Sequence, residues 1–298
     1  MRATVLLWSV VCVTWSAAWA LKLGSFNIQV FGERKAADKF VMSYLAKILA
    51  GYDIVLIMEI RDKTDDSIYK LIRLIKTQEN VEMVMKLSDR EGRTDSKEQY
   101  AYLYRADRGI SAIDVYKDNS QSWWKLFERP PYIVRFCSDK AEVGDFTLVG
   151  LHSKPLSAVQ ELQALPQVYN SVSKDWNTTN IVILGDLNAD CHYVSKNKWK
   201  VIPIRNDKRF WWPIVEGEDT TVESNCAYDR FIIGGKALKN AVVTKSPGPY
   251  YYNITYGLKH QQTLEISDHF PIQLQMQQNK NKGRRTSQCS GRATRHRG

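Results

Sequence analysis

After its first twenty residues, the sequence lacks any long hydrophobic run, any internal repeat and any linker-like stretch. No later segment reaches the roughly 18 apolar residues of a membrane-spanning helix, which argues against an integral membrane protein. Because neither a repeat nor a linker divides residues 21–278, one large domain is favoured there. Acidic residues are missing from residues 279–298, so nothing within that end balances its positive charge.

The one long apolar run lies at the N-terminus. Residues 1–20 contain a single arginine, an apolar stretch and the small-residue ending Ala18-Trp19-Ala20, which is typical of a secretory signal peptide. A membrane anchor or a buried N-terminal helix is the alternative, but charged residues follow at once. We therefore expect a mature chain that begins at Leu21 and is secreted or held in the endoplasmic reticulum lumen.

Positive charge is concentrated at the C-terminus. Residues 279–298 carry seven Lys and Arg, whereas residues 21–278 carry 34 basic and 32 acidic residues. Without apolar periodicity, this end is predicted to be a disordered basic tail. Such a tail favours binding to a polyanion such as DNA, heparan or anionic lipid, although a solubilising role is the alternative. Its composition also resembles a nuclear-import signal, but the signal peptide argues against the nucleus as the main address.

Four cysteines remain after the signal peptide: Cys137, Cys191, Cys226 and Cys289. Four cysteines allow three pairings, and the sequence alone does not choose among them. An oxidising compartment favours at least one disulfide. We expect the pair Cys191–Cys226, because each of the two lies beside a candidate site residue.

Short apolar strands alternate with three amphipathic helices, which are predicted near residues 39–50, 68–75 and 159–172. So many strands with so few helices indicate much antiparallel sheet. Helices that cover one face of each of two stacked sheets would bury them, so we predict a single α/β sandwich. The predicted strands are 21–30, 53–60, 82–87, 100–105, 111–117, 132–137, 146–153, 180–188, 228–235, 241–245 and 269–276.

Polar side chains gather at the ends of these predicted strands. A single Asp or Asn after a strand is usually a turn residue, and a single His is more often a hydrogen-bonded structural group. The whole set is harder to explain in that way, because strand ends are where α/β sheets present ligand sites. It comprises Asn27, Glu59, Arg61, Glu98, His152, Asp186, Asn188, Asp190, Asp229, Asp268 and His269.

This combination of side chains suits phosphodiester hydrolysis. Carboxylates alone would repel an anionic substrate, but carboxylates that hold a hard divalent cation neutralise the phosphoryl oxygens instead. Asparagine adds hydrogen-bond donors without negative charge. Histidines supply a base for water and an acid for the leaving oxygen near neutral pH, and each needs a carboxylate that sets its tautomer.

Seven motifs resemble those of the deoxyribonuclease I family, in the same order and at similar spacing: SFNIQVFGE, DIVLIMEIRD, KEQYAYLYR, LHSKP, GDLNADCHYV, NCAYDR and ISDHFP. The basic tail is more similar to the deoxyribonuclease gamma branch. The resemblance implies a four-layer α/β sandwich of the endonuclease/exonuclease/phosphatase type. It also implies a secreted endonuclease that hydrolyses double-stranded DNA to 5′-phosphate products with Mg²⁺ and Ca²⁺. Naked DNA and chromatin are both open as substrates.

The resemblance implies a role for each matching residue. The acid–base groups would be His152 with Glu98 and His269 with Asp229, and which histidine is the base stays open. The other implied roles are divalent metal or scissile phosphate for Asn27, Glu59, Asp186, Asn188 and Asp268; DNA contact for Arg61 and Asn188; structural Ca²⁺ for Asp219 and Thr221; and the larger disulfide of the family for Cys191 and Cys226.

Three departures from the family pattern concern DNA and calcium. Ser96 replaces a tyrosine, and Glu128 stands where a phosphate-binding arginine is expected, with Arg129 next to it. The loop after Asp219 is one residue shorter, with Ser224 as the third candidate ligand. We therefore expect intact catalysis with altered binding of naked duplex DNA.

Other interpretations remain open. The same fold and metal chemistry serve sphingomyelinases and inositol phosphatases. A sphingomyelinase would need exposed aromatic loops, which Trp123-Trp124 and Trp211-Trp212 could supply, although paired tryptophans more often lie in a core. A non-catalytic DNA- or actin-binding homologue is a further alternative, but the chain has both histidines and every metal carboxylate. Actin binding itself stays undecided.

Asp268 and His269 are neighbours at the entrance of the last predicted strand. Consecutive residues of a regular strand point to opposite faces, so both can serve one site only if this entrance is irregular. We expect the regular strand to begin at Phe270. Asp268 would then be directed toward the metal and Glu59, whereas His269 would be oriented by Asp229.

Overall fold

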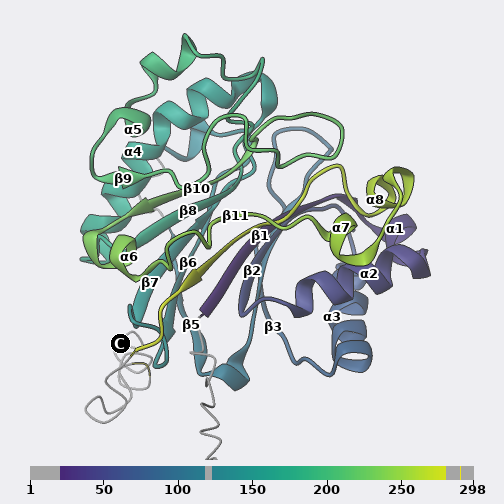
Figure 1. Ribbon diagram of the computed structural model, residues 1–298. Coiled ribbons are helices and arrows are strands. Elements are labelled where there is room, and N and C mark those ends of the chain that lie inside the picture. The colour runs from purple at the N-terminus through teal and green to yellow at the C-terminus, as the bar shows by residue number, and fades with distance from the viewer. Residues whose placement is uncertain (1–20, 118–122, 280–288, 290–298) are drawn as a thin grey trace, which may run out of the picture.

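The computed structural model describes residues 21–117, 123–279 and 289. The predicted signal peptide lies outside these residues, and so does the predicted basic tail apart from Asn279 and Cys289. Two six-stranded sheets face each other, and helices cover the outer face of each (Figure 1). This is the predicted four-layer α/β sandwich.

The two sheets are mainly antiparallel, as predicted. The first has the order β11 (Gly248–Pro249), β12 (Ile272–Met276), β1 (Leu21–Phe31), β2 (Ile54–Ile60), β4 (Gln99–Tyr104), β3 (Val84–Leu87). The second has the order β5 (Ile110–Val115), β6 (Tyr132–Ser138), β7 (Asp145–Gly150), β8 (Ile181–Asp186), β10 (Asp229–Gly234), β9 (Phe210–Trp211). The pairs β1–β2 and β7–β8 are parallel, and the other described pairs are antiparallel.

Three long helices match the predicted ones: α2 (Lys39–Ala50), α3 (Asp66–Glu79) and α4 (Ala158–Asp175). Asp38 caps α2, since its carboxylate accepts the backbone N–H groups of Phe40 and Val41. The shorter helices are α1 (Glu33–Ala37), α5 (Pro203–Asn206), α6 (Lys236–Ala241), α7 (Tyr252–Tyr256), α8 (His260–Ile266) and the 3₁₀ turns η1 (Ala106–Arg108), η2 (Trp124–Leu126), η3 (Pro155–Ser157) and η4 (Lys198–Val201).

Side chains of the central strands are buried on both faces, which explains their continuous hydrophobic runs. In β2, Leu56 and Met58 join the core between the sheets, whereas Val55 and Ile57 pack under α2 and α3. A third core lies between the second sheet and α4. The rigid sheets therefore fix the positions of residues at the strand ends.

One predicted strand is wrong. Residues 241–245 do not form a strand: α6 ends at Ala241, and Val242 makes only an isolated bridge to Met276. Leu238 and Ala241 are both buried, at the spacing of one helix face. This burial favours a helix that ends at Ala241 over the strand that the following β-branched residues predicted. The two-residue strands β9 and β11 were not predicted, because they are too short to produce a period.

The structure contains two disulfides. Cys191–Cys226 is the pair expected from the sequence. The second, Cys137–Cys289, was not predicted, and it joins the C-terminal segment to β6 across a sequence separation of 152. Disulfides are typical of an oxidising compartment. Among the described residues, no helix is long and apolar enough to cross a membrane.

Candidate active site

Strand ends bring the predicted polar residues together at one end of the sandwich. Asn27 and Glu59 belong to β1 and β2 of the first sheet, and Asp186 is the last residue of β8 in the second. The Asn27 amide joins the two sheets, because its Nδ2 donates to Glu59 Oε1 and to Asp186 Oδ2, both at 3.1 Å.

His152 and Glu98 form the first histidine–carboxylate pair. His152 follows β7 and Glu98 precedes β4, and His152 Nδ1 lies 2.5 Å from Glu98 Oε1. The exposed fractions of the two residues are only 5% and 1%. The backbone N–H of His152 also donates to the Tyr100 hydroxyl at 2.9 Å. The pair is thus held from both its backbone and its ring.

His269 and Asp229 form the second pair. His269 Nδ1 lies 2.8 Å from Asp229 Oδ2, and the Thr220 hydroxyl donates to the same oxygen at 2.9 Å. Asp229 is fully buried at the start of β10. The two predicted pairings are therefore present as contacts.

Asp186 lies between the two histidines. Its Oδ2 is 3.5 Å from Nε2 of His152 and 3.5 Å from Nε2 of His269. Its Oδ1 accepts the backbone N–H of Asn188 at 3.1 Å, and Asn188 adopts a positive φ of 47°. Both imidazoles thus turn their free nitrogen toward one point, with their other nitrogen held by a carboxylate.

Glu59 reaches the site through irregular backbone. It has a φ of 62° at a register shift in β2, and Gln29 and Val30 have positive φ at a matching shift in β1. The backbone N–H of Val30 donates to Glu59 Oε2 at 2.8 Å. Such bulges commonly redirect a side chain next to a functional site.

Asp268 and His269 precede the regular strand, as predicted, although β12 begins at Ile272 rather than at Phe270. The Ser267 hydroxyl donates to the carbonyl of Asn27 at 2.6 Å and accepts the backbone N–H of His269 at 3.1 Å. This irregular entrance lets neighbouring side chains serve one site.

Opposing effects set the pKa of the two histidines. Burial by itself lowers each pKa, because desolvation disfavours the charged imidazolium. Glu98 outweighs burial at His152 and raises its pKa, while Asp229 and Asp186 raise the pKa of His269 well above its usual value. Both imidazoles therefore hold a proton more readily than free histidine does.

Groups that could hold a metal ion lie at the same point. Ligand atoms of Asp186, Asp229 and His269 are all within 4.8 Å of one another. Since Asp229 and His269 already bind each other, a hard cation, which prefers oxygen, is better matched by Glu59 and Asp268 beside Asp186. Asp268 Oδ1 is buried without a hydrogen-bond partner among the described residues, and burial together with the nearby Glu59 raises the Asp268 pKa. A cation would relieve both conditions.

Arg61 lies at the rim of the site, with 32% of its side chain exposed. Its guanidinium is 3.2 Å from Glu59 Oε2 and 3.5 Å from Glu98 Oε2, and it donates to the Ser96 hydroxyl at 3.1 Å. Ser96, which replaces the tyrosine of the family pattern, therefore contacts the predicted DNA-contacting arginine.

Glu128, which stands where the family pattern has a phosphate-binding arginine, is turned away from the histidine–carboxylate pairs. Glu128 points to Lys154, with Oε2 and Nζ 3.0 Å apart. Arg129 lies at the site instead: its Nε is 3.0 Å from Glu98 Oε1 and it donates to the carbonyls of His152 and Ser153. The two consecutive side chains point in different directions, which the order of letters in the motif could not show.

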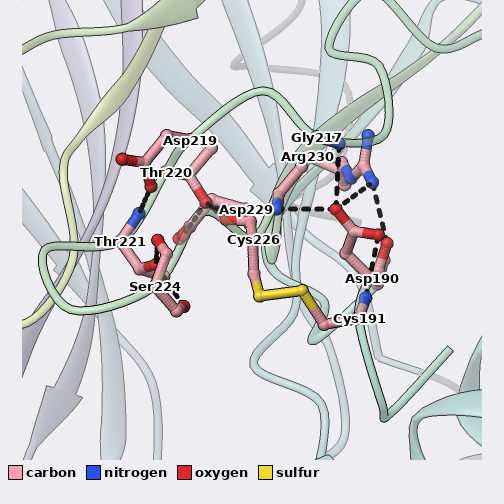
Figure 2. The surroundings of a disulfide bond; sticks show 12 residues. Asp190, Cys191, Gly217, Asp219, Thr220, Thr221, Ser224, Cys226, Asp229 and Arg230 are labelled. Carbon is pink, nitrogen blue, oxygen red and sulfur yellow. Dashed lines mark hydrogen bonds and ion pairs between the residues drawn. A yellow bond between two sulfur atoms is a disulfide. The ribbon is translucent and has the colours of Figure 1, made fainter.

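The predicted calcium ligands lie in one loop, before β10 (Figure 2). The backbone N–H of Thr221 donates to Asp219 Oδ1 at 3.0 Å, and the hydroxyl groups of Thr221 and Ser224 are 2.7 Å apart. Burial raises the Asp219 pKa. The loop thus gathers three oxygen-bearing residues, including the third candidate ligand Ser224.

Asp190, a further strand-end candidate, has a structural position. Its carboxylate accepts the backbone N–H groups of Cys191, Gly217 and Ala227 at 2.8, 3.1 and 2.9 Å and lies 3.8 Å from the Arg230 guanidinium (Figure 2). It therefore fixes the backbone on both sides of the Cys191–Cys226 disulfide.

Lys35 was missed by the sequence reasoning. Its ammonium donates to the carbonyls of Ile28, Gln29 and Ile266 at 2.9, 2.7 and 2.9 Å, so it ties the β1 bulge to the end of α8. Burial lowers its pKa to about 8, against the influence of Asp268. The only available signal was a lysine close behind the SFNIQVFGE motif, which looks like an ordinary surface residue.

Comparison with known proteins shows the family to which the chain belongs. Residues 24–269 match the endonuclease/exonuclease/phosphatase family. Deoxyribonuclease-1 of Bos taurus is 37% identical over 259 residues, covering 86% of this chain and 92% of the relative. Deoxyribonuclease gamma of Homo sapiens is 36% identical over 266 residues, covering 88% and 87%. A structure of an endonuclease/exonuclease/phosphatase family protein from Leptotrichia buccalis aligns with a TM-score of 0.59 at 15% identity, covering 87% of this chain and all of that one.

Proposed function

Because the chain belongs to the endonuclease/exonuclease/phosphatase family and, within it, to the deoxyribonuclease I-like proteins, we propose that it is a secreted DNA endonuclease. It hydrolyses phosphodiester bonds in double-stranded DNA and leaves 5′-phosphate ends. The observation that carries this proposal is the pair of buried imidazoles whose Nε2 atoms both lie 3.5 Å from Asp186 Oδ2.

The two histidines divide the proton transfers. Glu98 and Asp229 hold the Nδ1 atoms, so the Nε2 atoms are free to act on the substrate. One imidazole takes a proton from the attacking water, and the other gives a proton to the leaving 3′ oxygen. A raised pKa suits the histidine that gives its proton to the leaving oxygen, whereas the histidine that acts as the base must be deprotonated before it accepts a proton from water.

Mg²⁺ is the cation that we propose for Glu59 and Asp268, with Asn27, Asp186 and Asn188 directed to the metal or the scissile phosphate. The cation supplies positive charge for the phosphoryl oxygens when it is bound. Ca²⁺ is proposed for the loop of Asp219 and Thr221, in a structural role.

Contacts with DNA extend beyond the reacting phosphate. We propose that Arg61 enters a groove of the DNA and that Asn188 contacts the DNA backbone. Residues 21–278 would make up the nuclease domain, and the basic residues 279–298 would bind a polyanion such as DNA. The sphingomyelinase alternative gains no support from the paired tryptophans, since Trp123 and Trp212 are 1% and 6% exposed and their neighbours Trp124 and Trp211 are half-buried.

Plasmid nicking tests the proposal. Full-length protein should convert supercoiled plasmid to open circles with Mg²⁺ and Ca²⁺, and a chelator should stop the reaction. A His152→Ala variant that unfolds at the same temperature is the control against a contaminating nuclease. Nicking that resists chelation, or that survives in the variant, would exclude this mechanism.

A further inference from the structure

A cationic segment of the chain takes no part in the chemistry described above. Residues 191–206 carry Lys196, Lys198, Lys200 and Arg205 and contain no acidic residue. The segment begins directly after the loop of Asp186 and Asn188, so its position relative to the catalytic residues matters.

The segment is held firmly at its start. Cys191 is bonded to Cys226, only three residues before Asp229 (Figure 2). Asp190 accepts N–H groups from both sides of this disulfide, at Cys191 and at Ala227. The first residues of the segment are thus rigid with respect to both histidine–carboxylate pairs.

Core packing sets which side chains reach solvent. Val194, Trp199, Ile202 and Ile204 are buried in the core under α4. The lysines alternate with these residues and are exposed. Lys198 is partly committed, because its ammonium donates to the carbonyl of Tyr193 at 3.0 Å.

Lys196 and Lys200 instead line an open hollow of about 620 Å³, together with Asp190, Arg205 and Glu216. The two acids there are already engaged. Glu216 pairs with Arg205 at 2.8 Å, and Asp190 binds the backbone donors described above. Neither lysine has an ion-pair partner among the residues that the structure describes.

We propose that this hollow is a second phosphate-binding subsite, which takes backbone phosphates of the same DNA duplex beyond the scissile bond. The proposal rests on the proposed function and names a further part of its substrate surface. Two unpaired ammonium groups suit backbone phosphates, because such contacts position a duplex without reading its sequence. The buried Trp199 and the disulfide hold the backbone that carries these two lysines.

The test compares two double variants. Lys196→Ser with Lys200→Ser removes the proposed subsite, and Lys236→Ser with Lys245→Ser removes the same charge at the other end of the sheets. Lys236 follows the end of β10, whose first residue pairs with Asp186, and both control lysines are exposed. Each protein is assayed on a long DNA duplex over a range of NaCl concentrations, and on bis(p-nitrophenyl) phosphate, which has no neighbouring backbone phosphates.

On DNA, the slope of log(kcat/KM) against log[NaCl] should become shallower in the subsite variant. We expect a change of about 0.9 per lost phosphate contact, so up to about 2. Its hydrolysis of the small diester should equal that of the unchanged protein, and the control variant should keep the original slope. An unchanged slope in the subsite variant, or equal losses in both variants, would overturn the subsite and leave the nuclease assignment standing. Unchanged protein that hydrolyses neither substrate would overturn the proposed function, and the subsite with it.

Discussion

Replacing Glu161 with glutamine should stabilise the protein, relative to the unchanged protein, more at alkaline pH than at acidic pH. Glu161 lies in the first turn of α4 and is only 1% exposed. Its Oε1 accepts the backbone N–H groups of Glu128 at 3.1 Å and Lys154 at 3.3 Å. Its Oε2 is buried without a partner among the described residues. The side chain therefore joins two loops, but half of its carboxylate is poorly solvated.

Burial raises the Glu161 pKa from 4.5 to about 7. Between these values the folded protein binds more protons than the unfolded chain, so this group makes stability fall as pH rises. The difference of about 2.5 pKa units corresponds to about 3 kcal/mol of stability, which is fully present below pH 4.5 and lost as the pH rises past 7. Glutamine keeps the oxygen acceptor and cannot ionise, so the variant escapes this loss.

Urea unfolding between pH 4.5 and pH 8 measures the effect. The free energy of unfolding of Glu161→Gln minus that of the unchanged protein should rise by about 3 kcal/mol across this range. A constant offset from the new amide group would not alter that rise. Glu33→Gln, at an exposed carboxylate, is the matched control and should show no comparable rise. Parallel curves for Glu161→Gln and the unchanged protein would refute the reasoning.

Three further changes test other parts of the structure. His152→Ala should lower kcat on DNA by about 10²–10⁴ with little change in unfolding temperature, since it removes one proton-transfer group; a loss below tenfold would contradict that role. Lys35→Met should lower the free energy of unfolding by about 1–3 kcal/mol, measured with denaturant, because three carbonyls lose the ammonium that donates to them; an unchanged free energy of unfolding would show that this lysine does not hold the β1 bulge. Cys137→Ser with Cys289→Ser should lower the free energy of unfolding by about 2–5 kcal/mol, measured with denaturant, because a long loop is released; no loss would show that the disulfide does not constrain the unfolded chain.

Periodicity predicted the parts of the fold that depend on burial. The continuous apolar run of β2 follows from packing against a layer on each face. The helical spacing in α2 follows from packing against one layer only. The strand predicted at 241–245 failed because β-branched residues also occur after a short helix whose buried face had only two members. Local composition could not tell these cases apart.

At the site, the sequence could not predict the direction in which each side chain points. The residue types indicated a histidine and carboxylate set, and the pairs formed as the resemblance implied. Arg129 and Glu128 show what sequence could not supply, because adjacent residues in an irregular loop can point either way. Lys35 shows a second limit: a buried ammonium satisfied by three carbonyls has no sequence signature.

The entrance of β12 joins these observations. The carbonyl of Asp268 accepts the N–H of Val222, and the N–H of Phe270 donates to the carbonyl of Thr220, both at 2.8 Å. The loop that gathers the proposed calcium ligands is therefore bonded to the backbone on both sides of His269. Thr220 also donates to the carboxylate that orients His269. An ordered loop would thus act on catalysis through the direction of one imidazole.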